Sequence, residues 1–242
     1  MLRQIFCFFS FIIISLTLSG PVVSQESIPP HRFVAVPDTD FFGSDLDAIF
    51  DTDLQSCVRI CANRPNCAGF TFNTRSDSCF PKSAIGERQV FEGAISALKQ
   101  PVAKSVRDLG DNRSTALGFL PTDDLERAAL QARDIGLRHP PGDADTDRLI
   151  ETARRRASLR EYEAAARWLG AAVAVSDSAG LWADYADYLL KAENDSSSRQ
   201  RAYRERAYAA ALNSFLRSDS NGAQVNALVL AAQALEDLRR GR

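Results

Sequence analysis

Histidine is scarce in this chain, and its scarcity argues against the commonest catalytic arrangements. The sequence of 242 residues contains two histidines, His31 and His139, and each lies beside a proline. Neither has a partner in the sequence that would suggest nucleophilic or general acid–base catalysis. We therefore expect no catalytic residue, no enzymatic activity and no cofactor.

The chain also lacks an excess of positive charge. It has 29 lysines and arginines against 31 aspartates and glutamates, so its formal net charge is −2. Proteins that bind the nucleic-acid backbone normally carry a basic surface. The arginines at 154–156 and 199–206 are interspersed with acidic residues, which favours solvated helix faces over a site for an anionic partner. We expect no nucleic-acid partner.

A long apolar run is found only at the N-terminus, at residues 5–18, where it follows Arg3. A helix needs about 20 apolar residues to cross a bilayer, so this run is too short and is typical of a secretory signal peptide. Small residues at Val22 and Ser24 suit cleavage after Ser24. We expect a signal peptide at 1–24, a mature chain without a membrane span, and export to a periplasm or the extracellular space. An uncleaved anchor is the alternative.

No cysteine follows Cys79, and the mature chain carries its cysteines close together at Cys57, Cys61, Cys67 and Cys79. An even number of cysteines in an exported chain implies disulfide bonds. Structural zinc sites usually combine two closely spaced cysteine pairs, and the long gap before Cys79 does not fit that pattern. We expect two disulfides and no metal site, and the sequence alone leaves three connectivities open.

Local patterns predict a helix and several strands around these cysteines. Thr52 and Gln55 have the spacing of a capping box, which predicts a helix from Asp53 with Cys57 and Cys61 on one face. Proline then ends the helix. Alternating residues between turn-forming clusters predict antiparallel strands at 32–36, at 68–72, from 79 onward and at 90–98.

Together these segments resemble a PAN/apple domain over residues 31–99. The resemblance rests on Phe-Phe-Gly-Ser-Asp-Leu at 41–46, Cys-x3-Cys at 57–61, Pro-Asn-Cys-Ala-Gly-Phe-Thr-Phe-Asn at 65–73 and Cys-Phe-Pro-Lys-Ser at 79–83. It implies a helix held on a curved antiparallel sheet by nested disulfides, Cys57 with Cys79 and Cys61 with Cys67. The third bridge of blood-protein apple domains is missing, so the resemblance is to the minimal type.

PAN/apple modules bind proteins or carbohydrates and catalyse nothing, so the resemblance implies a recognition function. Polar residues on rigidly held loops are available for binding. The candidate ligand contacts of this kind are Asp38, Asp40, Asn73, Arg75 and Asp77. A purely structural role in turns is the alternative for each. Of Phe41 and Phe42, at least one is expected in the core, and an exposed ring would be a further contact.

The second half of the chain is expected to be helical. Residues 100–121 contain proline, glycine, asparagine and serine and are predicted to be a linker. From residue 122 to 242 the apolar period becomes helical, and Ser-Asp-Ser recurs at 176–178 and 218–220. The recurrence indicates tetratricopeptide-like helical repeats, with an ordinary helical bundle as the alternative. The predicted fold class is thus α+β, a small disulfide-bridged domain followed by an all-α domain.

The last predicted helix is unusually apolar. Residues 220–235 contain no charged side chain. A helix that is apolar around most of its circumference is normally covered, whereas a terminal repeat normally turns a polar face outward. We therefore expect a further helical repeat or a partner chain against the C-terminal helix.

The order of signal peptide, PAN domain and Ala/Arg-rich helices is similar to the N-terminal region of PAN-bearing alpha-2-macroglobulin-like proteins of proteobacteria. The similar residues lie at 40–50, 67–83, 118–120 and 181–182. The resemblance implies a family of endopeptidase inhibitors that use a bait region and a Cys-x-Glu-Gln thioester, and this chain has neither. The main hypothesis is an exported binding protein with a helical scaffold. The alternative is a truncated N-terminal part of such an inhibitor.

Overall fold

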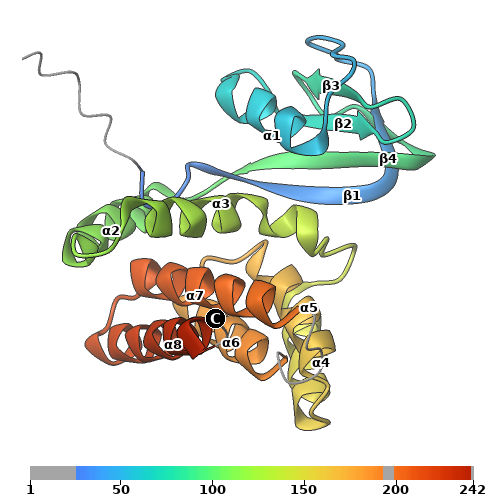
Figure 1. The fold of residues 1–242 in the computed structure, drawn as a ribbon. Helices are drawn as coiled ribbons and strands as arrows, with labels where there is room; N and C mark the ends of the chain where they lie inside the picture. The colour runs from blue at the N-terminus through green and yellow to red at the C-terminus, as the bar shows by residue number, and fades with distance from the viewer. Residues whose placement is uncertain (1–25, 193–198, 241–242) are drawn as a thin grey trace, which may run out of the picture.

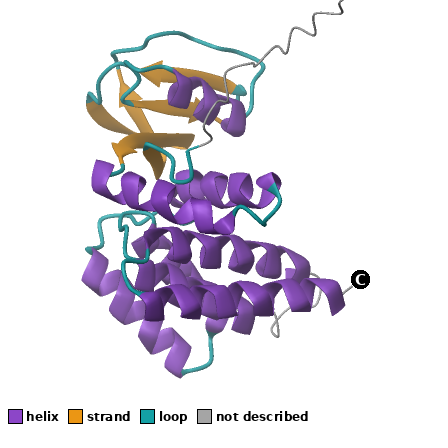
Figure 2. Ribbon diagram, turned by 90° about the vertical axis from the view of Figure 1, so that its left-hand side faces the viewer, coloured by secondary structure: helices purple, strands orange, loops and turns teal. Residues whose placement is uncertain are grey.

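The computed structural model describes residues 26–192 and 199–240. In these residues a small antiparallel sheet with one helix and two disulfides is followed by a mostly helical region, which confirms the predicted fold class. The two parts form successive layers (Figure 1, Figure 2). The expected signal peptide at 1–24 lies outside the described residues.

The sheet is antiparallel, with its strands in the order β1-β4-β2-β3. Their bounds are His31–Phe42 for β1, Gly69–Asn73 for β2, Ser78–Lys82 for β3 and Glu87–Pro101 for β4. Each expected strand is present, and β1 and β4 are longer than predicted. Helix α1, Leu54–Asn63, covers one face of the sheet (Figure 1).

The long antiparallel pair of β1 and β4 bends midway along its length. The pairing register shifts between Pro37 and Thr39. The intervening Asp38 has a positive φ of 50°, and its carboxylate accepts a hydrogen bond from the Gly93 N–H at 3.1 Å. A bulge of this kind bends a strand without ending it. The strand therefore continues past Pro37 to Phe42, although the sequence pattern had predicted that it ends at residue 36.

Helix α1 is capped by a different residue from the one predicted. Asp53 is the N-cap, and its carboxylate accepts a hydrogen bond from the Ser56 N–H at 2.6 Å. The predicted capping box was wrong, because Thr52 is held outside the helix by the bond from its N–H to the Asp77 carbonyl at 2.9 Å. Aspartate caps a helix at least as well as threonine, so the start moves to Leu54.

Two disulfides fix α1 to the sheet. They join Cys57 to Cys79 and Cys61 to Cys67, with Cα–Cα distances of 5.5 and 5.4 Å. This is the pairing that the family resemblance implied. At the C-terminal end of α1, the Lys99 ammonium donates hydrogen bonds to the Cys61 and Arg64 carbonyls, each at 3.0 Å. A cation at this end is favourable because the unpaired helix carbonyls carry partial negative charge.

Residues 100–121 do not form a linker. Strand β4 extends to Pro101, and helix α2, Lys104–Ser114, and the short 3-10 helix η1, Thr115–Leu117, follow. Gly110 lies inside α2, where a Cβ atom would come within 2.6 Å of the Ile28 side chain. The linker prediction was wrong because this glycine permits close packing instead of breaking the chain.

The helices predicted after residue 122 are all present. They are α3 Thr122–Arg138, α4 Thr146–Ser158, α5 Tyr162–Val173, α6 Ala179–Ala192, α7 Gln200–Arg217 and α8 Asn221–Arg240. Helix α3 lies between the sheet and α7 (Figure 1). The helical region has one core, made largely of alanine, leucine and tyrosine side chains. The tetratricopeptide-like repeat stays a prediction, and so does the bundle alternative.

A network of charged side chains joins the helical region to the sheet. Arg32 on β1 donates hydrogen bonds to both carboxylate oxygens of Asp177, at 3.0 and 3.2 Å. Arg217 on α7 lies 3.7 Å from the same carboxylate, and its side chain is 3% exposed. Elsewhere along β1, a Cβ atom on Gly136 of α3 would lie only 2.2 Å from the Phe33 carbonyl oxygen. The two parts therefore pack closely against each other.

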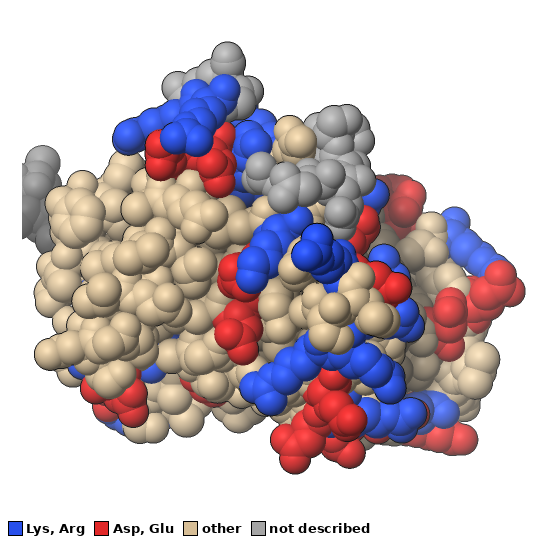
Figure 3. Space-filling view, turned by 90° about the horizontal axis from the view of Figure 1, so that it is seen from below, with Lys and Arg blue, Asp and Glu red and all other residues tan. Residues whose placement is uncertain are grey.

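Helix α8 buries one side and leaves apolar residues on the other. Val225, Leu228 and Val229 are 61%, 39% and 58% exposed. Figure 3 shows a broad area without charged side chains over this helix. The expected repeat or partner chain at this surface stays a prediction. In the described ranges, neither α8 nor any other helix has the length and apolarity to cross a membrane.

Candidate ligand-binding site

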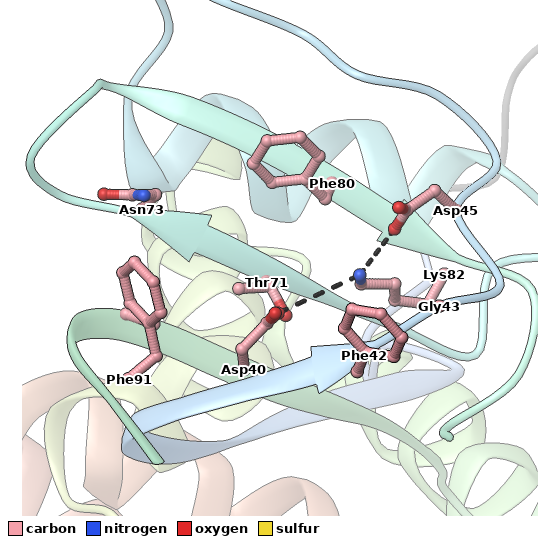
Figure 4. Close-up of a pocket in the computed structure, with 10 residues that line it drawn as sticks. Asp40, Phe42, Gly43, Asp45, Thr71, Asn73, Phe80, Lys82 and Phe91 are labelled. Atoms are coloured by element: carbon pink, nitrogen blue, oxygen red, sulfur yellow. Dashed lines mark ion pairs between the residues drawn. The ribbon is translucent and has the colours of Figure 1, made fainter. Parts of the chain in front are cut away.

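A cavity lies on the face of the sheet opposite α1. Phe70 and Phe72 of β2 pack toward the cysteines beneath α1. Because side chains alternate along a strand, Thr71 and Asn73 point to the other face, and so do Phe80 and Lys82 on the neighbouring β3. The bent end of β1 lies over this face (Figure 4). The cavity is open on one side and has a volume of about 320 Å³.

Three phenylalanine rings line this cavity. They come from Phe42 at the end of β1, Phe80 on β3 and Phe91 on β4 (Figure 4). Phe42 is 59% exposed and Phe91 is 43% exposed. Phe50 packs edge-on against the Phe80 ring, with 6.4 Å between the two ring centroids. The exposed rings give the cavity apolar walls that a ligand could cover.

Charged side chains occupy one end of the cavity. The Lys82 ammonium lies 2.5 Å from the Asp45 carboxylate and 3.9 Å from the Asp40 carboxylate (Figure 4). Its side chain is 3% exposed, whereas Asp40 and Asp45 are 28% and 47% exposed. The lysine is thus fixed inside the protein, and the two carboxylates remain open to the cavity.

Hydrogen bonds make the floor of the cavity rigid. The Thr71 and Ser96 hydroxyls lie 2.7 Å apart, and the Ser96 hydroxyl donates to the Thr39 carbonyl at 2.7 Å. The Phe41 N–H donates to the Thr71 hydroxyl at 3.1 Å. Phe41 itself is fully buried. These buried bonds tie the bent end of β1 to the sheet, so the cavity is preformed.

The structure places two of the five predicted contact residues in the cavity. Asp40 and Asn73 line it. The Asp38 carboxylate is hydrogen-bonded to the Gly93 N–H at the β-bulge, and Asp77 lies in a turn with a positive φ of 46°. Arg75 forms an exposed ion pair with Glu92 at 3.2 Å. These last three lie outside the cavity, where they stabilise turns or remain solvated.

Sequence reasoning missed several lining residues. Phe42 is exposed while its neighbour Phe41 is core, so the expectation for this pair is confirmed. Phe80, Lys82 and Asp45 were not singled out. The alternation along β3 was the available signal, because Cys79 had to face α1 and its neighbours therefore had to face away.

The two histidines lie on different elements, His31 on β1 and His139 at the end of α3. His139 lies partly buried in the helical region, with its Nε2 3.0 Å from the Tyr185 hydroxyl. Burial, together with nearby arginines, lowers the pKa of His139 to about 3. His31 lies on β1, where partial burial and Lys99 lower its pKa. Among the residues that the structure describes, no group of three or more His, Cys, Asp or Glu side chains could hold a metal ion.

Comparisons with known proteins agree with this architecture. Residues 31–99 match the family model of the PAN domain. The chain is also 31% identical over 93 residues to a Zea mays protein described as putative receptor protein kinase ZmPK1. This match covers 37% of the chain and 11% of the maize protein. No solved structure matches the chain. Residues 31–99, with their disulfide-bridged helix and bent antiparallel sheet, are therefore a PAN domain.

Proposed function

We propose that this chain is an exported recognition protein whose PAN domain binds a carbohydrate in the cavity at Phe42 and Asp40. The helical region acts as its scaffold, and the protein has no catalytic activity of its own. The observation that carries the proposal is the preformed cavity, which combines exposed aromatic rings with open carboxylates.

The lining of the cavity suits the amphipathic surface of a sugar. The C–H face of a sugar ring can pack on Phe42 and Phe91, which are both partly exposed. Sugar hydroxyls can donate hydrogen bonds to the carboxylates of Asp40 and Asp45, since ionised carboxylates accept at several positions. A volume of about 320 Å³ is at the small end of typical ligand sites.

A protein ligand fits this site less well. A stable protein–protein interface buries about 800 Å² on each partner, and its centre is normally apolar and free of charge. The cavity instead has three charged side chains at one end. A protein ligand would have to extend over neighbouring loops, so its free energy of binding would not depend mainly on Phe42.

The disulfides support the export part of the proposal. Two buried disulfides are typical of proteins that fold in an oxidising compartment. N-terminal sequencing of the protein from a secreting host tests export. A mature N-terminus close to Gln25, in material found outside the cytoplasm, is the expected result. An intact Met1 in reduced, cytoplasmic material would contradict it.

The binding test uses the full chain and a matched pair of variants. After a glycan array selects a ligand, titration calorimetry should show that F42A weakens binding by at least about 10-fold, or about 1.4 kcal/mol. The control is F119A, because Phe119 is also an exposed phenylalanine, at 75%, and lies outside the cavity. Equal affinity of F42A and F119A, or no binding to any glycan, would overturn the proposal.

The uncovered face of α8 supports a second candidate function. In an alpha-2-macroglobulin-like protease inhibitor, these residues would be an N-terminal part, and following helices would cover Val225 and Leu228. Translation of the gene beyond Arg242 tests this candidate. An open frame that reaches Cys-x-Glu-Gln is the expected result for such an inhibitor, and a stop codon directly after Arg242 would exclude it.

A further inference from the structure

We infer that the sugar bound in this cavity carries a positive charge, as in an amino sugar with a free ammonium group. This inference rests on the proposed carbohydrate-binding function and specifies its ligand. Three features of the site support it: a carboxylate that Lys82 does not hydrogen-bond, the faces of phenylalanine rings, and a cation that is held away from the ligand.

The cavity has more negative than positive charge. Two carboxylates, of Asp40 and Asp45, face one ammonium, of Lys82. Lys82 contacts Asp45 directly at 2.5 Å, whereas its 3.9 Å distance from Asp40 exceeds hydrogen-bonding range. Asp40 therefore retains its capacity to accept a hydrogen bond from a ligand cation, and charge-assisted bonds of this type are the stronger ones.

The basic side chains near the site cannot neutralise it. Lys82 is the one basic residue among the described residues that line the cavity, and it is nearly buried. Arg75 pairs with Glu92, and the Arg88 guanidinium lies over the Phe41 ring at 5.6 Å. Neither arginine lines the cavity. An acidic sugar would thus meet two carboxylates and no available cation.

The aromatic rings favour the same charge. The face of a phenylalanine ring is electrostatically negative and attracts an ammonium group within about 6 Å of the ring centre. The protein already uses this interaction, because the Lys82 ammonium lies 5.8 Å from the centre of the Phe80 ring. Phe42 and Phe91 are exposed and can offer the same contact to a ligand ammonium (Figure 4).

Two oligosaccharides with one backbone test the inference. A β-1,4-linked glucosamine hexamer and the N-acetylglucosamine hexamer differ only at the nitrogen on C2, which is a charged ammonium in the first and a neutral acetamide in the second. We expect the full chain, titrated at low salt and at a pH where the amine is protonated, to bind the glucosamine hexamer at least about 10-fold more tightly. The difference should shrink as salt is added, because exposed charges are screened.

Variants separate the cavity from the general charge of the surface. D40N should weaken binding of the glucosamine hexamer by about 5- to 10-fold and that of the N-acetylated hexamer by much less, because the asparagine oxygen still accepts hydrogen bonds from sugar hydroxyls but carries no charge. The control D77N removes the same charge from a turn outside the cavity, and asparagine tolerates the positive φ of 46° there. This control should bind both hexamers as the unmodified chain does.

The possible outcomes are distinguishable. Equal or tighter binding of the N-acetylated hexamer, still weakened by F42A, would overturn the charge inference and leave the proposed function in place. Equal losses in D40N and D77N would overturn it too, because the effect would then be non-specific. Binding of a tetralysine peptide in the absence of any saccharide binding would overturn both, since the cavity would then recognise basic protein side chains.

Discussion

At the scale of single residues, His139 shows how the helical core constrains the charge of a side chain. Its ring lies beside Gly170, where an added Cβ atom would come within 2.4 Å of it. Nε2 lies 3.0 Å from the Tyr185 hydroxyl, and Nδ1 is buried without a partner. Burial and the neighbouring Arg138, Arg206 and Arg167 lower its pKa to about 3, so the folded protein contains the neutral ring.

This neutral histidine should make the protein sensitive to acid. His139 binds a proton with a pKa of about 6.5 in the unfolded chain, whereas its pKa in the folded chain is about 3. The contribution of the neutral His139 to the free energy of unfolding is therefore complete above about pH 6.5 and is lost progressively as the pH decreases toward 3. Between pH 7.5 and pH 5, we expect His139 to account for a loss of about 2 kcal/mol in the free energy of unfolding.

Urea unfolding at both pH values measures this loss. H139Q keeps a hydrogen-bonding side chain near Tyr185 and does not titrate in this range, so its stability should fall about 2 kcal/mol less than that of the unmodified chain. The comparison of the two proteins removes the contribution of the carboxylates. Parallel stability losses in both proteins would show that His139 is not the acid-sensitive group.

At the scale of elements, the sequence predicted the type of each element better than its ends. The helices after residue 122 have regular apolar periods, so their positions were predicted correctly. Three errors share one cause. Pro37, Gly110 and Thr52 carry local signals for a strand end, a linker and a cap, and tertiary contacts override each of them. Only two of the five predicted contact residues line the cavity, because the cavity depends on how β1 bends over β2 and β3, which no local pattern specifies.

The outer disulfide should stabilise the PAN domain more than the inner one does. Cys57 and Cys79 are separated by 22 positions, and Cys61 and Cys67 by 6. By the chain-entropy relation, removing the outer bridge costs about 3 kcal/mol and removing the inner one about 2 kcal/mol. Urea unfolding of the double variants C57S/C79S and C61S/C67S measures both losses. A larger loss for the inner pair would contradict the entropic account.

Gly136 determines how closely helix α3 approaches β1. A Cβ atom there would lie 2.2 Å from the Phe33 carbonyl oxygen and 3.0 Å from the Val34 Cα, and both are backbone atoms that cannot rotate away. We expect G136A to lower the free energy of unfolding by about 1–3 kcal/mol, although alanine is the better helix former.

The matched control for this variant is G180A. Gly180 also lies in a helix, but the nearest atom to its added Cβ would be the Ser178 hydroxyl at 3.7 Å. Alanine there should be neutral or should stabilise by up to about 1 kcal/mol. Thermal and urea unfolding of both variants give the comparison. Equal stability of G136A and G180A would mean that α3 and β1 can separate without cost.

At the scale of the whole molecule, the PAN domain and the helical region are coupled through Asp177. The Arg217 side chain is 3% exposed, and its guanidinium lies 5.1 Å from the Trp182 ring. Burial lowers the pKa of Arg217 to about 10, and Asp177 acts in the opposite direction. The arginine therefore stays charged at neutral pH and depends on this carboxylate, which Arg32 on β1 also holds.

Removing that carboxylate should weaken the connection between the two parts. D177N leaves the buried Arg217 without a counterion, and breaking a buried pair from one side costs about 3–5 kcal/mol. Arg32 loses its bidentate partner at the same time, so protease sensitivity should rise at the junction of β1 with the helices.

The control D187N breaks an exposed pair with Lys191 and should cost less than about 1 kcal/mol. Urea unfolding followed by tryptophan fluorescence gives the free energies, and limited proteolysis locates the opening. If D177N and D187N were equally stable and equally resistant to protease, the sheet would be held by α3 alone, and the Asp177 network would contribute nothing to the assembly of the molecule.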